Sequence, residues 1–190
     1  MNNPARARAA LWGAMRLLRF DRGGLTGFDA SREGFVHSFY AVALAVPLFL
    51  LVISLENMML ARAGGSGYSL VWALLSYGVR WAGFIAIAYG FARMLQREAE
   101  FAGFVTAFNW AKPLFLVVLL PLVGLGAAGA IGAEAYGGLG LILRLYLAAV
   151  QVFLIFAAFR LALFEAAAIF IVKYFYDTLI ELMFRAAGAA

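Results

Sequence analysis

The stretch LGLILRLYLAAVQVFLIFAAFRLALFEAAAIFIVKYFYDTLIELMF, from Leu139 to Phe184, decides how this chain folds. Its 46 residues contain no proline and a single glycine, Gly140, so nothing in them marks an obvious turn. A continuous helix of this length would extend about 69 Å, more than twice the ~30 Å hydrocarbon core of a bilayer. The run therefore either folds back as two spans or leaves the bilayer as an amphipathic tail.

The composition of the whole chain places it in the membrane class. Hydrophobic residues make up 66% of its 190 residues and charged residues 13%, whereas a soluble domain is about half apolar and a quarter charged. The prediction is an all-α, polytopic helical membrane protein with four spans and a fifth over 161–184. Cysteine is absent and there is one histidine, so thiolate and histidine-rich metal sites are excluded and no cofactor is expected.

Residues 1–34 form the only extended polar segment, and arginine dominates it. It lacks the apolar core and cleavage site of a secretory signal. Leu11, Met15 and Leu18 share one helical face, which predicts a short helix on the cytoplasmic leaflet in contact with anionic lipid. Asp29 is the expected N-cap of the helix that follows.

Residues 35–190 are predicted to form one transmembrane helical domain. Its spans are expected at about 35–55, 69–95, 104–131, 138–159 and 161–184. The connection at 96–103 contains Arg97, whereas the loop at 132–138 contains Glu134 and no basic residue. The positive-inside rule therefore predicts a cytoplasmic N-terminus. Rich usage of Ala, Gly and Arg is typical of a GC-rich bacterium, so the bacterial inner membrane is the expected location.

The fifth span has one competing interpretation, an amphipathic tail lying on the membrane surface. Its polar residues are spaced by multiples of four and form one narrow stripe, whereas a surface helix has a wider polar arc. The pattern favours a span whose stripe faces inward. The stripe consists of Glu165, Lys173, Asp177, Glu181 and Arg185.

Ionisable and polar residues inside spans are the candidate functional residues, because a charge in hydrocarbon costs at least ~2.5–3.5 kcal/mol. Arg80 is the first of them, and a structural pair with Glu165 or Asp177 is its simpler explanation. Spacing of four residues also predicts pairs within the last helix, Lys173 with Asp177 and Glu181 with Arg185. The candidates for pairing or function are Arg80, Asn109, Lys112, Arg160, Glu165, Lys173, Asp177 and Glu181.

The hexapeptide from Phe108 to Pro113 is chemically the most unusual part of the third span. Asn109 is the expected donor of a hydrogen bond between helices. Lys112 is expected to extend back to the cytoplasmic interface, with Trp110 as the interfacial aromatic residue. The sequence contains no catalytic pair, serine elbow or phosphate loop, so it does not predict an enzyme and assigns no catalytic residue.

The segment Gly27-Phe28-Asp29-Ala30-Ser31-Arg32-Glu33-Gly34-Phe35, followed by Ser38-Phe39, resembles the Yip-type family of small five-span membrane proteins, in particular its bacterial members. Asn109-Trp110 and the segment from Arg160 to Asp177 are similar as well. The resemblance implies a cytoplasmic N-terminus, five spans and an outside C-terminus. Eukaryotic members bind small GTPases through a longer cytoplasmic N-terminal region. Because this chain has only residues 1–34 in that place, a small GTPase is not expected as its partner.

Two functions follow from the sequence. The favoured one is a non-enzymatic scaffold or accessory subunit of a larger membrane complex, whose partners are lipid, other membrane subunits or another copy, and not nucleic acid. The alternative is a small transporter or channel, which requires polar faces that converge around water instead of pairing in a dry interior. Its polar path would be lined by Arg80, Asn109, Lys112, Lys173 and Asp177.

Overall fold

The computed structural model describes residues 4–188, and within that range the chain is helical without a strand. The elements in chain order are α1 (Pro4–Leu18), the 3-10 helix η1 (Arg22–Gly27), α2 (Arg32–Arg62), α3 (Leu70–Met94), α4 (Glu98–Ala128), α5 (Ala133–Phe159) and α6 (Leu163–Ala187). The predicted all-α fold is confirmed.

Four helices of the described chain, α2 to α5, are long and apolar enough to cross a membrane. Their outward faces carry large apolar side chains, such as Val71 and Ile142, which are 69% and 66% exposed. Exposed apolar surface of this extent needs a nonaqueous environment. α6 is as long as α3, at 25 residues, but it carries the charged stripe and is not in this apolar group.

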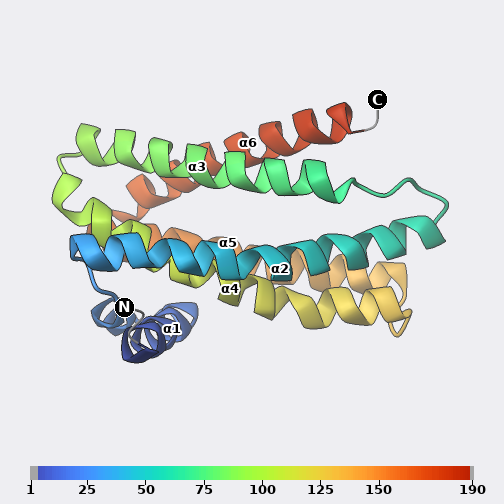
Figure 1. The fold of residues 1–190 in the computed structure, drawn as a ribbon, viewed down its shortest axis with the longest axis horizontal. Helices are drawn as coiled ribbons and strands as arrows, with labels where there is room; N and C mark the ends of the chain where they lie inside the picture. Colours follow the sequence, from blue (N-terminus) through green and yellow to red (C-terminus); the bar gives the residue numbers. More distant parts are fainter. Residues whose placement is uncertain (1–3, 189–190) are drawn as a thin grey trace.

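The long helices run roughly side by side, with α3 and α6 on one side of the bundle and α2, α4 and α5 on the other (Figure 1). α2 and α5 both pack against α4, and α6 packs against α3 and α5. α1 is seen close to end-on in this view, so it crosses one end of the bundle (Figure 1). The turn between α3 and α4 and the turn between α5 and α6 lie at the same end of the bundle as α1 (Figure 1). Arg93 and Arg97 belong to the first turn and Arg160 to the second, so we call this the arginine-rich end.

The chain turns back between α5 and α6, as one of the two alternatives for the long apolar run requires. Arg160 ends α5 in the left-handed conformation, with φ of 54°, although glycine is the usual residue there. The Leu161 N–H donates to the Phe156 carbonyl (3.2 Å), and the Leu161 side chain is buried. A backbone hydrogen bond and a buried anchor thus replace the expected glycine or proline.

The core at the arginine-rich end consists largely of phenylalanine. The rings of Phe104 and Phe159 stack at 4.5 Å between centroids, and those of Phe84 and Phe108 lie 4.7 Å apart. All four side chains are at most 2% exposed. Because aromatic pairs contribute about 0.5–1.5 kcal/mol beyond their area, this cluster fixes α3, α4 and α5 relative to one another.

The N-terminal segment folds differently from the prediction. α1 buries Ala10, Ala14 and Leu17 against the bundle, whereas Met15 is exposed and Leu11 lies at the edge. Small residues allow α1 to approach its neighbours more closely than the large side chains of the predicted apolar face would. At Gly13, for example, an added Cβ would lie 2.5 Å from the Gly24 carbonyl oxygen of η1. The buried face therefore combines the small side chains of Ala10 and Ala14 with Leu17, and it is not the face predicted from Leu11, Met15 and Leu18.

The start of α2 is capped by Ser31 and not by Asp29. The Gly34 N–H donates to the Ser31 hydroxyl (3.1 Å), and the Ser31 N–H donates to the Asp29 carboxylate (2.9 Å). Asp29 thus supports the capping residue from outside the helix.

The helix bounds also differ from the predicted spans, since α2 continues to Arg62, α4 already begins at Glu98, and α5 includes most of the expected loop at 132–138.

Candidate functional site

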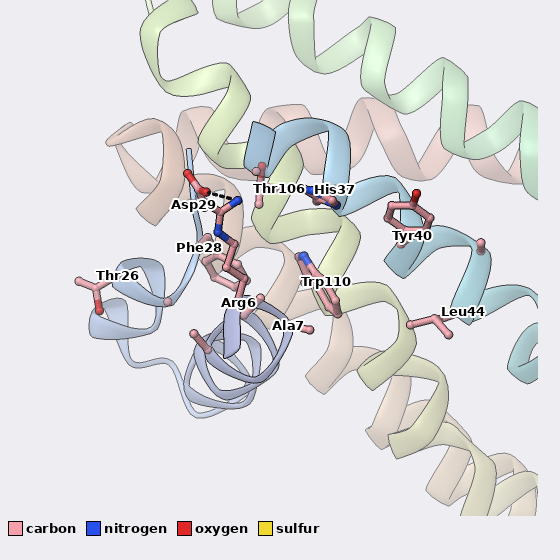
Figure 2. A pocket seen from close by; sticks show the side chains of 15 residues that line it. Arg6, Ala7, Thr26, Phe28, Asp29, His37, Tyr40, Leu44, Thr106 and Trp110 are labelled. Atoms are coloured by element: carbon pink, nitrogen blue, oxygen red, sulfur yellow. Dashed lines mark ion pairs between the residues drawn. The ribbon is translucent and has the colours of Figure 1, made fainter. Parts of the chain in front are cut away.

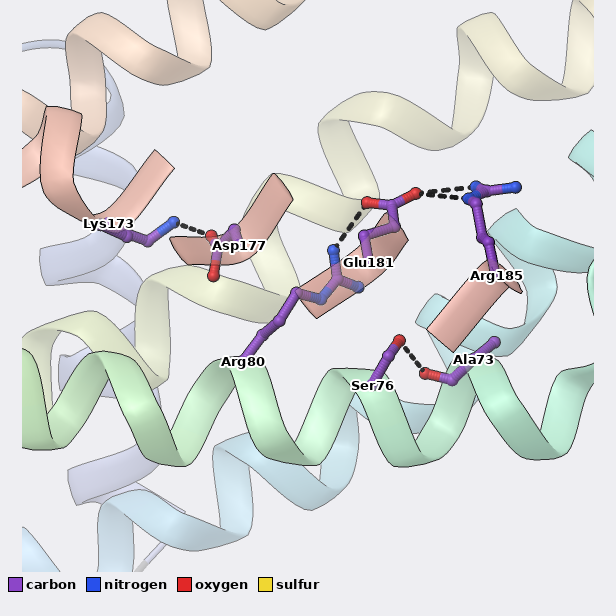
Figure 3. Close-up of polar contacts among 7 residues, drawn as sticks. All are labelled: Ala73, Ser76, Arg80, Lys173, Asp177, Glu181 and Arg185. Atoms are coloured by element: carbon purple, nitrogen blue, oxygen red, sulfur yellow. Dashed lines mark hydrogen bonds and ion pairs between the residues drawn. The ribbon is translucent and has the colours of Figure 1, made fainter. Parts of the chain in front are cut away.

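Charged side chains of α3 and α6 form a chain of ion pairs along the inner side of α6 (Figure 3). The Arg80 guanidinium lies 3.0 Å from the Glu181 carboxylate, which also accepts from Arg185 at 2.7 Å. One turn earlier, the Lys173 ammonium lies 2.6 Å from the Asp177 carboxylate. The two pairs predicted within α6 are confirmed.

The partner predicted for Arg80 was wrong, although its pairing with an acid of the last helix was right. Arg80 contacts Glu181, four residues beyond Asp177. The Glu165 carboxylate instead accepts from the Ala162 N–H (2.8 Å) at the start of α6. Glu165 therefore stabilises the beginning of the helix and lies away from the other charges.

A small polar cavity lies beside this chain of ion pairs, in the interior of the bundle. Its volume is about 230 Å³, and every long helix from α2 to α6 contributes to its wall. Three cationic side chains and one carboxylate belong to that wall. The lining residues are Phe49, Tyr77, Arg80, Lys112, Phe115, Leu116, Gln151, Lys173 and Asp177.

Lys112 lies in the wall of this cavity and does not extend to the interface, so that prediction was wrong. Its ammonium is 5.4 Å from the ring centroid of Tyr77 and 5.6 Å from that of Phe108. Among residues 4–188 it makes no ion pair or hydrogen bond with an acidic side chain. Trp110 is also buried, at 8% exposed, so its ring packs inside the protein.

The cavity has a surplus of positive charge. Arg80, Lys112 and Lys173 face a single lining carboxylate, that of Asp177. The surplus stays the same when the neighbouring pair of Glu181 and Arg185 is included in the count, because these two residues carry opposite charges. Buried charges are normally paired, so this surplus distinguishes the cavity from an ordinary network of structural ion pairs.

Two buried donors of the same wall also lack a partner. Among the described residues, neither the Arg80 Nε nor the Tyr77 hydroxyl makes a hydrogen bond. Unsatisfied buried polar groups are rare in folded proteins and call for an explanation. Here they occur in the wall that also contains the unpaired ammonium of Lys112.

Asn109 lies outside the cavity and joins three helices. Its amide donates to the Ser38 hydroxyl of α2 (2.8 Å) and accepts from the Trp81 indole N–H of α3 (2.9 Å). The predicted hydrogen bond between helices is confirmed. Because both polar ends of the amide are satisfied, Asn109 does not line the polar path proposed from the sequence.

A larger groove, of about 700 Å³, lies at the arginine-rich end between α1, η1, α2 and α4 (Figure 2). Its wall includes Phe28, Tyr40, Leu44 and Trp110. The arginine and the carboxylate of its wall, Arg6 and Asp29, pair with each other at 3.7 Å, and Arg6 also lies 3.1 Å from Glu33, which is not part of the wall. The groove offers apolar surface but no unpaired charge, so the smaller cavity is the better candidate for a functional site.

Sequence reasoning missed Tyr77 and Gln151, which periodicity does not distinguish from ordinary helix residues. It placed Arg160 among the candidates, but this residue is exposed at the turn and lies outside the cavity wall.

Within residues 4–188 no group of three or more His, Cys, Asp or Glu side chains could hold a metal ion. Comparison of the chain with protein-family models, curated proteins and solved structures found no match.

Proposed function

We propose that the protein is a non-enzymatic membrane protein that binds a small polar solute in the cavity and carries it across the bilayer. The observation that supports this proposal is Lys112, a cation that faces the cavity without an acidic partner. A purely structural network gains nothing from such a group, because burying an unpaired charge is costly. A solute site needs unpaired groups that a ligand can satisfy.

The proposal includes α6 as a fifth span. Its 25 residues would extend about 37 Å, enough for the ~30 Å hydrocarbon core. Its outer face carries Phe175, Leu179 and Leu182, which are each more than half exposed and suit contact with lipid. The arginine-rich end would lie on the cytoplasmic side of a bacterial inner membrane, with α1 against anionic headgroups.

Flux measurements in proteoliposomes test the proposal. A panel of labelled solutes should include an anion, a cation and a neutral compound: phosphate, choline and glycerol. Lys112→Met should reduce flux of the transported solute about tenfold or more, the size of effect that loss of one strong polar contact produces. Arg97→Gln removes one exposed charge elsewhere and should leave flux unchanged. Flux equal to that of empty vesicles for every solute would refute transport.

An accessory subunit of a larger complex is the second candidate function. Its support is the rest of the charged stripe, because Arg80, Glu181 and Arg185 pair with one another as a dry scaffold would require. Purification of the tagged protein from its native membrane in mild detergent, with quantitative mass spectrometry, tests it. A partner recovered at fixed stoichiometry would favour this function, and a monomer or homo-oligomer alone would exclude it. The Yip-type resemblance remains a prediction.

A further inference from the structure

We infer that the cavity enclosed by α2 to α6 binds a small free oxyanion of the phosphate or carboxylate class. This inference rests on the proposed function and names its substrate class. Three features of the wall support it: its charge, its unpaired donors and its volume. The distribution of lysine in the chain provides the probe that tests it.

The charge of the wall selects the sign of the ligand. Arg80, Lys112 and Lys173 oppose Asp177 alone, and Asp177 is already paired with Lys173 at 2.6 Å. A cation entering the cavity would meet this surplus at close range, where low dielectric strengthens repulsion. An anion would compensate the surplus and would bring the buried charges close to balance.

The unpaired groups select an oxygen-rich acceptor. The Lys112 ammonium has three N–H donors, and the Arg80 Nε and the Tyr77 hydroxyl each add a buried donor without a partner among residues 4–188. An anion with several oxygens can accept from such donors at once, and charge-assisted hydrogen bonds are the stronger kind. A neutral solute would satisfy the donors and leave the charge surplus.

The volume limits the size of the ligand. About 230 Å³ lies below the ~300–1,000 Å³ of pockets that take drug-sized ligands. At ~30 Å³ per water molecule, there is room for a phosphate-sized or short dicarboxylate ion with a few waters. A lipid headgroup carries the same phosphate chemistry, so the test separates that source from a free ion.

The distribution of lysine provides the most direct probe. The chain contains two lysines, Lys112 and Lys173, against thirteen arginines, and both lysines belong to the cavity wall. A sample labelled with ¹³C at the lysine ε-carbon therefore gives side-chain NMR signals from this cavity alone. Lys112→Met assigns the two signals by removing one of them.

The experiment titrates the labelled full-length protein in detergent with inorganic phosphate, with succinate, with choline and with glycerol. We expect saturable shifts of both lysine signals with phosphate or succinate and none with choline or glycerol. In Lys112→Met the remaining Lys173 signal should need about tenfold more anion to shift, or more. Arg97→Gln is the control and should retain the wild-type affinity.

The wild-type titration keeps the inference falsifiable even if Lys112→Met fails to fold. Lysine signals that respond to pH but to neither anion would overturn it, as would saturable binding of choline or glycerol. A shift produced by added phosphatidylglycerol but not by phosphate would also overturn it and would assign the site to a lipid headgroup. Anion binding without flux in proteoliposomes would support the inference and refute transport. Choline flux without anion binding would support transport and overturn the inference.

Discussion

The Arg80 guanidinium on α3 lies 3.0 Å from the Glu181 carboxylate on α6, and this contact joins two residues that are 101 positions apart in the chain. Glu181 is shared, because Arg185 donates to its other oxygen at 3.0 and 2.7 Å. The two members of the pair are therefore not equivalent. Removing Arg80 leaves Glu181 with a cation, whereas removing Glu181 takes away the ion-pair partner of both Arg80 and Arg185.

Glu181→Gln should consequently destabilise the protein more than Arg80→Leu. Loss of one partner of a buried pair costs about 3–5 kcal/mol, and Glu181 is partly exposed, so a loss of about 1–3 kcal/mol is expected for Glu181→Gln. Thermal unfolding in detergent, followed by tryptophan fluorescence, measures both variants. The reversed pair Arg80→Glu with Glu181→Arg should recover part of the loss. Equal losses in the two single variants would contradict this unequal role.

Asn109→Leu should destabilise the bundle by about 1–3 kcal/mol, the cost of leaving buried polar groups unsatisfied. The substitution removes the acceptor of the Trp81 indole N–H and the donor to the Ser38 hydroxyl. Thr106→Val is the matched control, since the Thr106 hydroxyl donates only to the Ala102 carbonyl of its own helix (2.9 Å). Chemical or thermal unfolding in detergent compares the two variants. A similar small effect in both would show that Asn109 does not join the helices energetically.

The predictable parts of this fold are those that depend on one helix at a time. Hydropathy identified the four apolar helices, and the spacing of four residues identified the pairs Lys173–Asp177 and Glu181–Arg185. The polar character of Asn109 likewise indicated an interhelical contact, because a buried amide in a span needs a partner. None of these inferences requires knowledge of how two helices are aligned.

The alignment of neighbouring helices decides the remaining features, and a single sequence does not specify it. Arg80 meets Glu181 instead of Asp177 because of the position at which α3 packs on α6. Lys112 faces inward because the rotation of α4 is set by its contacts with several helices at once. The buried face of α1 was missed because Ala10 and Ala14 pack by being small, a signal that hydropathy does not weigh.

Gly83 is one residue that sets the alignment of α3 on α6. A Cβ added there would lie 1.9 Å from the hydroxyl oxygen of Tyr176, which donates to the Val79 carbonyl at 2.9 Å. Gly83→Ala should therefore displace Tyr176, break this hydrogen bond and lower the unfolding temperature. Gly78→Ala on the same helix meets no atom within 4 Å and should be neutral or stabilising by up to about 1 kcal/mol. Equal stability of the two variants would refute the role of Gly83.

Acid should weaken two contacts of α1, that of Arg16 with Asp21 at the start of η1 and that of Arg6 with Asp29 before α2. A hydrogen bond from the Ser31 side chain is the main cause that lowers the pKa of Asp29 below 3.8, followed by one from the Ser31 N–H and by the nearby Arg6. A hydrogen bond from Arg16 lowers the pKa of Asp21 below 3.8 in the same way, followed by one from the Gly23 N–H. Both carboxylates interact more favourably when ionised, so their contribution is present above pH 3.8 and is lost as the pH falls through the folded pKa values.

Hydrogen exchange of the amides in residues 4–28, corrected for the intrinsic exchange rate at each pH, measures the weakening of these contacts. We expect constant protection from neutral pH down to about pH 5 and a loss of protection below pH 3.8. The reason is that these carboxylates stabilise the folded state when ionised, and they become protonated only in acid. Asp29→Asn should show weaker protection at neutral pH and a smaller change in acid. Arg6 keeps its contact with Glu33 at 3.1 Å in that variant, so part of the docking should persist. Protection that rises on acidification, or an Asp29→Asn profile identical to wild type, would show that Asp29 does not hold the N-terminal helix to α2.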